Sequence, residues 1–272
     1  MYDPCSKTLF IGKKIVYLPT CHSTNDIAAE LVRKENLPEG TVVITDAQTA
    51  GRGQHGTRWE ASQSHNFTFS LLLRPSFLAI PEQFLLSQTV AIGVRDFVAN
   101  FTGRVKIKWP NDIYINELKV GGILIENAWQ GTRMSHAIVG IGLNVNQIHF
   151  ASEPESETAE NSIRATSLRL ETGRNWALNE QLCRLLHCLE HAYLRLRAGQ
   201  YEQIQNDYYT ALLGYRENRL FRESGQEFEG CVVGVTALGK LRIKKANGEQ
   251  KEYGIKEVEW LWSGSHSSPE IP

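Results

Sequence analysis

The sequence predicts a mixed α/β fold of the α+β kind, followed by a small β barrel. Apolar residues alternate in several short segments before residue 150, and they recur at helical spacing between and after these segments. From residue 218 the chain changes to short β segments separated by glycine turns, and Asn247-Gly248 is a strong hairpin signal. We therefore expect an α/β domain at residues 1–217, a barrel at 218–263 and a disordered tail at 264–272.

The composition argues against several classes of protein. The 272 residues carry 29 basic and 30 acidic side chains, which argues against binding DNA through bulk charge. No window approaches 18 apolar residues and the N-terminus has no signal pattern, so we expect a cytoplasmic protein without membrane spans. The cysteines are odd in number and lack CxxC spacing, which predicts reduced thiols: Cys5, Cys21, Cys183, Cys188 and Cys231.

The first strand is expected at residues 14–18, ended by Pro19, and a helix should follow it. Ser23 with Asp26 three residues later has the form of a capping box, which places the start of that helix. The polar run Ser23-Thr24-Asn25 can simply cap the helix. A helix N-terminus with hydroxyl and amide groups can equally bind a polar ligand, and the pattern leaves both readings open.

A strand at residues 41–45 leads into a glycine-rich loop that runs from Gln48 to Trp59. Gly51 and Gly53 flank Arg52, so backbone N–H groups can approach a ligand closely while the guanidinium binds carboxylate or phosphate. A flexible surface turn is the alternative. No apolar helical stripe follows the loop, which excludes a dinucleotide-binding fingerprint.

The middle of the chain predicts a strand at 66–73, a long amphipathic helix at 85–101 and an alternating strand at 104–109. The basic face of the last strand, which includes Lys108, is either solvated or directed at a ligand. It runs into Pro110-Asn111-Asp112, which presents an amide and a carboxylate. A hairpin at 112–125 follows, with Lys119 at the entry to its second strand.

A strand at residues 137–145 has Gly140, Gly142 and Asn144 on one face. Because glycine forfeits side-chain packing, a helix or a ligand should lie flat on that face, and Asn144 favours a ligand. The acidic segment 151–162 reads as a loop, and a helical stripe runs from Leu178 to Leu196. The H-x-x-E-H pattern at residues 187–191 lies on the charged face of that helix, which favours solvated histidines over zinc.

These motifs, in this order, resemble the biotin protein ligases of the biotin and lipoate ligase superfamily over residues 14–262. The segments that carry the resemblance are 23–25, Gln48 with 51–53 and Trp59, 108–112, 119–124 and 140–144. It implies a catalytic α/β domain related to class II aminoacyl-tRNA synthetases, with a mixed sheet and flanking helices, and an SH3-like barrel. It also implies that biotin and ATP form biotinyl-5′-AMP, and that a lysine of a biotin carboxyl carrier domain then accepts the biotinyl group.

The resemblance also assigns roles to residues. Lys119 and Arg52 are the expected catalytic cations. The expected biotin ligands are Ser23, Thr24, Asn25, Gln48, Gly51, Arg52, Gly53, Gln54, Lys119, Gly122, Gly140 and Gly142, with the apolar biotin tail over Gly140 and Gly142. The expected ATP ligands are Arg52, Trp59, Lys108, Asn111, Lys119 and Asn144, with Trp59 stacked on adenine and Mg²⁺ carried by ATP near Asn111 or Asp112.

The chain departs from the family pattern in two places. The segment before the strand at 14–18 is too short for the DNA-binding helix-turn-helix domain of some members, so we expect no DNA partner and no repressor function. A homodimer is compatible with the sequence. Gln54 and His55 stand where many relatives carry basic or small residues, which bears on how firmly the loop retains the adenylate. One rival reading is a lipoate or octanoyl transferase of the same superfamily, but the Gly-Arg-Gly loop and Trp-Pro-Asn-Asp favour biotin. The other is a non-enzymatic barrel that binds RNA, against which the balanced charge argues.

Overall fold

The computed structural model of the protein describes residues 2–56, 59, 63–150 and 165–262. It contains a seven-stranded sheet and, after it in the chain, a five-stranded antiparallel sheet. The second sheet begins at Asn218, where the sequence predicts the barrel domain. Within these ranges, no helix combines the length and the apolarity that crossing a bilayer requires. The predicted loop 151–162 and tail 264–272 lie outside the described residues.

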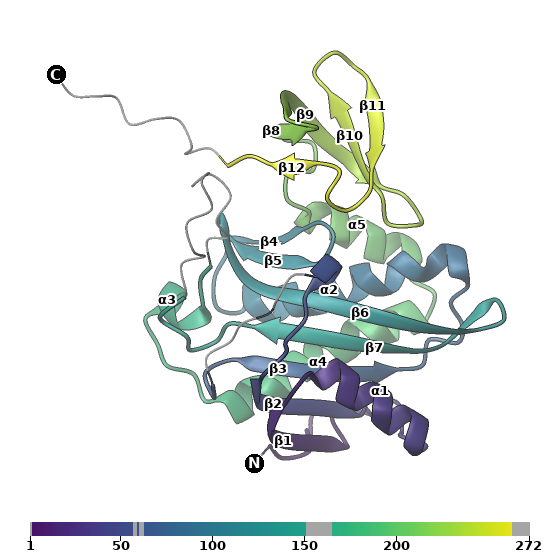
Figure 1. Ribbon diagram of the computed structural model, residues 1–272, viewed down its shortest axis with the longest axis vertical. Coiled ribbons are helices and arrows are strands. Elements are labelled where there is room, and N and C mark those ends of the chain that lie inside the picture. The colour runs from purple at the N-terminus through teal and green to yellow at the C-terminus, as the bar shows by residue number, and fades with distance from the viewer. Residues whose placement is uncertain (1, 57–58, 60–62, 151–164, 263–272) are drawn as a thin grey trace.

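The large sheet has the order β1-β2-β3-β7-β6-β5-β4, and Figure 1 shows it running from β1, near the N-terminus, to the β4–β5 edge. β1 and β2 are parallel and all the other neighbours are antiparallel. The bounds are β1 Ile15–Cys21, β2 Val42–Gln48, β3 Phe67–Leu73, β4 Val105–Lys108, β5 Asp112–Ile115, β6 Leu118–Gln130 and β7 Arg133–Leu143.

Helices cover the two faces of this sheet unequally. α2 (Gln83–Ala99), α4 (Leu178–Arg197) and α5 (Tyr201–Ala211) lie behind it in Figure 1 and bury its apolar face, which includes Phe69 and Ile141. α1 (Thr24–Lys34) covers the opposite face near β1–β3, where a second cluster forms around Leu72 and Ile138. Residues of β3–β7 on the rest of that face line a cavity.

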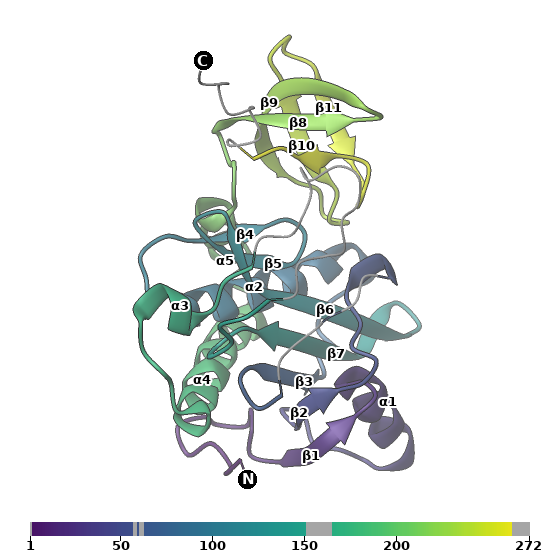
Figure 2. The same ribbon diagram turned by 60° about the vertical axis from the view of Figure 1, so that its left-hand side comes forward.

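The small sheet stands beyond the β4–β5 edge of the large one, as Figure 2 shows. Its strands are β8 Asn218–Glu223, β9 Gln226–Val235, β10 Leu241–Lys245, β11 Gln250–Tyr253 and β12 Glu259–Trp260. Hydrogen bonds join it to the α/β region: Trp109 Nε1 donates to Gly239 O at 2.8 Å, and the Tyr209 hydroxyl of α5 donates to Val235 O of β9 at 3.3 Å.

Most strands and the long helices match the sequence-based predictions, but β7 begins at Arg133 instead of residue 137 and β12 was not predicted. Three further differences follow. β1 continues through Pro19 to Cys21, because β1 is an edge strand, where a residue without N–H is tolerated. β6 extends to Gln130, five residues past the predicted hairpin strand. Two helices are new: α3 (Leu168–Thr172), which is short, and α5, whose polar residues obscure its stripe.

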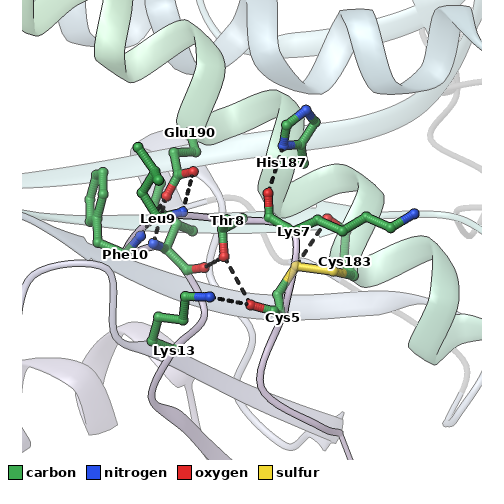
Figure 3. The surroundings of a disulfide bond; sticks show 10 residues. Cys5, Lys7, Thr8, Leu9, Phe10, Lys13, Cys183, His187 and Glu190 are labelled. Atoms are coloured by element: carbon green, nitrogen blue, oxygen red, sulfur yellow. Dashed lines mark hydrogen bonds between the residues drawn. A yellow bond between two sulfur atoms is a disulfide. The ribbon is translucent and has the colours of Figure 1, made fainter.

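The N-terminal arm before β1 is anchored on α4, and this overturns one prediction. Cys5 and Cys183 form a disulfide, with Cα atoms 5.3 Å apart, so the expectation of five reduced thiols is wrong for these two. The signal was invisible because 178 residues separate the partners. Figure 3 shows that Glu190 also binds the arm: its carboxylate accepts backbone N–H bonds from residues 9–11 at 2.7–2.9 Å. The acidic residue of the H-x-x-E-H pattern is therefore a structural anchor.

Candidate active site

A single row of paired residues crosses the open face of the sheet and forms the floor of the site. Lys108, Asp112, Gly122, Gly142 and Thr68 face one another on β4, β5, β6, β7 and β3 in turn. Because directly paired residues of adjacent strands project to the same face, segments far apart in the chain meet here. The two glycines leave the middle of the row without side chains, and charged side chains lie at its β4–β5 end.

A β-bulge turns Lys119 towards this row. Ile113 pairs with Gly121 but Tyr114 pairs with Lys119, so Val120 is the extra residue. Without the bulge, strand alternation would place Lys119 on the face opposite to Gly122. With it, Lys119 Nζ lies 2.8 Å from Asp112 Oδ1, in an ion pair whose side chains are only 17% and 21% exposed. The site thus holds a mostly buried ammonium with a fixed counter-ion.

The start of α1 contributes a polar cluster. The helix begins at Thr24 as predicted, but the Ser23 side chain makes no capping hydrogen bond, and Ser23 lines the cavity instead. Gln48 Oε1 accepts hydrogen bonds from Thr24 N at 2.8 Å and from Thr24 Oγ1 at 3.2 Å. The Asn25 amide donates to Glu126 Oε2 at 2.7 Å, and Ser70 Oγ lies 2.6 Å from Asn25 Oδ1. Capping by the Ser23 side chain is therefore excluded, which favours the ligand-binding reading.

Arg52 lies on the rim of the cavity, and its ion pairs do not involve Lys119 or Asp112. Its Nη2 atom is 2.5 Å from Asp26 Oδ1 and 3.2 Å from Glu126 Oε1, and its side chain is 47% exposed. Two carboxylates therefore hold the guanidinium. Any role as a catalytic cation requires that Arg52 leave at least one of them.

The glycine floor is covered by side chains of the protein itself. A Cβ atom on Gly140 would lie 2.5 Å from Asn25 Oδ1, and one on Gly142 would lie 2.2 Å from the Trp59 ring. With Asn25 and Trp59 in these positions, neither glycine can be replaced by a larger residue. The Trp59 indole N–H is buried and has no hydrogen-bond partner among the described residues. Stacking of Trp59 on adenine and passage of the biotin tail over Gly142 stay predictions, and the second requires the indole to move.

Lys108 occupies the β4 end of the row. Its Nζ atom lies 5.3 Å from the ring centroid of Tyr114 and 5.2 Å from that of Trp262. Burial lowers the pKa of Lys108, and Asp112 partly opposes this effect. Asn111, in the turn after the strand, donates from its side-chain amide to Ile123 O. The peptide bond between Trp109 and Pro110 is cis.

The cavity has a volume of about 590 Å³ and lies between the large sheet and the segment 255–262 of the barrel. Its lining brings together these predicted site residues: Ser23, Thr24, Asn25, Gln48, Arg52, Gly53, Gln54, Trp59, Lys108, Asn111, Asp112, Lys119, Gly122, Gly140 and Gly142. Two predicted residues are outside the lining. Gly51 packs against Trp59 O and the Gln48 amide. Asn144 is buried and donates to Thr166 O at 3.0 Å, which ties the segment around residue 166 to the end of β7.

Sequence reasoning missed several lining or supporting residues. Thr68 and Ser70 alternate with the apolar residues of β3, and Glu126 has the parity of Gly122 on β6, so strand alternation could have found all three. The segment 255–262 carries no motif and could not have been assigned. It reaches the cavity only through the packing of the barrel on the sheet.

Comparison with known proteins assigns a family to this geometry. Residues 17–144 match the model of the Biotin/lipoate A/B protein ligase family. The bifunctional ligase/repressor BirA of Bacillus subtilis is 32% identical over 248 residues, which span 91% of this chain and 74% of that protein. The biotin–[acetyl-CoA-carboxylase] ligase of Paracoccus denitrificans is 29% identical over 232 residues, or 84% and 93% of the two chains.

Solved structures agree with these relatives. The biotin protein ligase of Aquifex aeolicus in complex with biotin and ATP superposes with a TM-score of 0.70 at 27% identity, covering 91% of this chain and 98% of that one. The match includes most of both chains, so the α/β fold with a C-terminal β domain is confirmed.

Proposed function

The chain belongs to the biotin protein ligases, within the biotin/lipoate A/B protein ligase family, and on this premise we propose how its cavity works. The protein is a biotin ligase that uses ATP to activate biotin and transfers it to a lysine of a biotin carboxyl carrier domain. The observation that carries the proposed mechanism is the mostly buried Lys119–Asp112 ion pair beside the glycine floor.

The first half-reaction forms biotinyl-5′-AMP. An oxygen of the biotin carboxylate attacks the α-phosphorus of ATP, and the bond from that phosphorus to the bridging oxygen breaks as pyrophosphate leaves. Two anions must approach each other and further charge develops on the phosphate oxygens. The Lys119 ammonium, largely shielded from water, would stabilise that charge, and Arg52 would add a second cation after release from Asp26 or Glu126.

The second half-reaction transfers the acyl group. The neutral amine of the acceptor lysine attacks the acyl carbon, the carbon–oxygen bond to phosphate breaks, and AMP leaves with the bonding electron pair. Negative charge collects first on the acyl oxygen, where Lys119 would again stabilise it. The nitrogen must also lose a proton, and the Asp112 carboxylate, which lines the cavity beside Lys119, would accept it.

The polar and basic ends of the cavity suit the two substrates. Hydroxyl and amide groups of Ser23, Thr24, Asn25 and Gln48 would bind the ureido head of biotin, because a buried ureido group without partners costs about 1–3 kcal/mol. Gly53, Gln54 and Gly122 line the same cavity and would contact biotin there. Lys108 and Asn111 would bind ATP phosphates at the other end. Gly51 and Asn144 would support the site from outside the lining.

The residues of this site fit a magnesium ion that binds together with the phosphates of ATP. Among the described residues no cluster of three or more histidine, cysteine, aspartate or glutamate side chains could cage a metal ion. Magnesium usually binds through one or two carboxylates together with phosphate oxygens, and Asn111 and Asp112 line the cavity at the phosphate end. These residues would hold the ion, which neutralises phosphate charge when bound.

The transfer reaction tests the proposal. The protein is incubated with biotin, ATP, Mg²⁺ and a purified biotin carboxyl carrier domain, and the acceptor is analysed by mass spectrometry. We expect one biotinyl group on the acceptor lysine and none when that lysine is replaced by arginine. Transfer of lipoyl or octanoyl groups in place of biotin would support the transferase reading.

A further inference from the structure

Lys108 is a cavity lysine whose charge is held by aromatic rings. Among the described residues its Nζ atom has no ion pair and no hydrogen bond, whereas Lys119 is paired with Asp112 and Arg52 with two carboxylates. Tyr114, which is 4% exposed, and Trp262 supply the rings. These rings stack with centroids 5.5 Å apart and an interplanar angle of 20°.

An aromatic partner acts differently from a carboxylate. The ring quadrupole attracts the ammonium and limits where it can go, but the rings supply no negative charge and leave the three N–H groups available. A cation held in this way at the end of a ligand cavity is prepared for anionic oxygens. The paired Lys119 must share its charge with Asp112.

The barrel determines the position of Trp262. β12 pairs with β8, Leu261 N donates to Leu220 O at 3.1 Å, and the Trp260 ring packs on Phe221 with centroids 4.9 Å apart. Trp262 follows this anchored stretch directly, and the Trp109–Gly239 hydrogen bond fixes the barrel on the same sheet edge that carries Lys108. The ring is therefore presented to the cavity by the C-terminal sheet.

We propose that Trp262 is a positioning residue for ATP: it holds the Lys108 ammonium at the phosphate end of the cavity, so the barrel completes the nucleotide site. This inference rests on the proposed function, because it assumes that the anion beside Lys108 is the triphosphate of ATP. Trp262 acts through Lys108, and its removal should weaken ATP binding while biotin binding is unaffected.

The test compares Trp262→Ala and Trp262→Phe with the matched control Tyr215→Ala. Tyr215 is a half-buried aromatic beside the cation of Arg216, outside the cavity lining. Binding of Mg-ATP and of biotin is measured separately by calorimetry, and thermal unfolding shows that each variant is folded. We expect Trp262→Ala to raise the Kd of Mg-ATP about 5- to 30-fold, which is the range a desolvated cation–π contact supports. Trp262→Phe should restore most of the affinity, and Tyr215→Ala should not change it.

A double-mutant cycle separates positioning from general support. In a Lys108→Met background, Trp262→Ala should have almost no further effect on the Kd of Mg-ATP. The same fold-loss in both backgrounds, or an equal loss of biotin affinity, would overturn the inference while leaving the ligase assignment intact. A wild-type protein that binds neither Mg-ATP nor biotin would instead refute the proposed function.

Discussion

At the scale of single residues, the account depends most on Lys119. Lys119→Ala should lower the rate of adenylate formation about 10²- to 10³-fold, because it removes a shielded cation from the transition state. The Kd of biotin should change little. Single-turnover formation of biotinyl-5′-AMP and equilibrium biotin binding measure the two effects.

Lys106→Ala is the matched control, since Lys106 lies on the same strand face as Lys108 and donates to Thr210 O, outside the cavity lining. It should leave both quantities unchanged. Equal losses of adenylation and biotin binding in Lys119→Ala would mean that Lys119 binds substrate without stabilising the transition state.

Gln54 is the second informative residue, because it lines the cavity within the glycine loop and carries no charge. Gln54→Arg should slow the release of biotinyl-5′-AMP about tenfold, since a charge-assisted hydrogen bond to the phosphate is stronger than a neutral one. Trapping of the released adenylate by a free amine in solution measures the rate. Unchanged release would show that this position does not control retention.

Single residues also show how much of the site could be predicted from the sequence. Motif spacing identified Ser23, Gln48, Arg52, Lys108 and Lys119, and the structure brings all of them to one cavity. Motif spacing could not predict the partners that orient these side chains. The bulge at Val120, which turns Lys119 to Asp112, and the carboxylates that hold Arg52 follow from strand register and side-chain packing between distant segments.

At the scale of elements, strand periodicity predicted nearly every strand. The helix α5 was missed, and β6 was predicted to be shorter than it is. α5 (Tyr201–Ala211) has few aliphatic residues, and its buried side chains include Tyr208. The sequence therefore shows no clear apolar stripe for this helix. The continuation of β6 to Gln130 depends on its pairing with β7, which local sequence does not encode. Both misses concern elements that tertiary contacts define.

One prediction at this scale concerns the barrel. Glu223 on β8 accepts hydrogen bonds from Lys251, Lys245 and Tyr253, which lower the pKa of its carboxyl below the usual 4.5. A carboxyl with a lowered pKa in the folded state adds stability above its unfolded pKa, and this stability is lost as the pH falls through the folded value. Glu223→Gln should therefore lower the Tm by a few degrees at pH 7 and progressively less below about pH 4.

Thermal unfolding between pH 3 and pH 7 follows this difference. Glu227→Gln is the control, because Glu227 pairs with Arg222 through a side chain that is 49% exposed, and such pairs contribute little. A Tm difference for Glu223→Gln that stays constant with pH would show that lost packing, and not the charge, causes it.

At the scale of the whole molecule, the disulfide joins segments that are 178 residues apart in the chain. Cys5–Cys183 ties the N-terminal arm to α4, behind the sheet and away from the cavity face. Cys5→Ser should lower the free energy of unfolding by about 2–4 kcal/mol under oxidising conditions. Because Glu190 still binds the arm and the site lies on the other face, biotin activation should not change.

Denaturant unfolding with and without a reductant tests this prediction, and Cys188→Ser, which removes a free and half-buried thiol, is the control. A reductant should destabilise the wild type and leave Cys5→Ser unaffected. Equal stability of the wild type in both conditions would mean that the bridge contributes nothing to folding.

The central claim is that one cavity, built from the sheet, the glycine loop and the barrel, activates biotin with ATP. Exchange of labelled pyrophosphate into ATP tests it most directly, because exchange requires reversible formation of the acyl-adenylate. We predict exchange that depends on biotin and Mg²⁺, is not supported by lipoate or octanoate, and is lost in Lys119→Ala. Exchange with lipoate but not with biotin, or no exchange with any of these acids, would contradict the account.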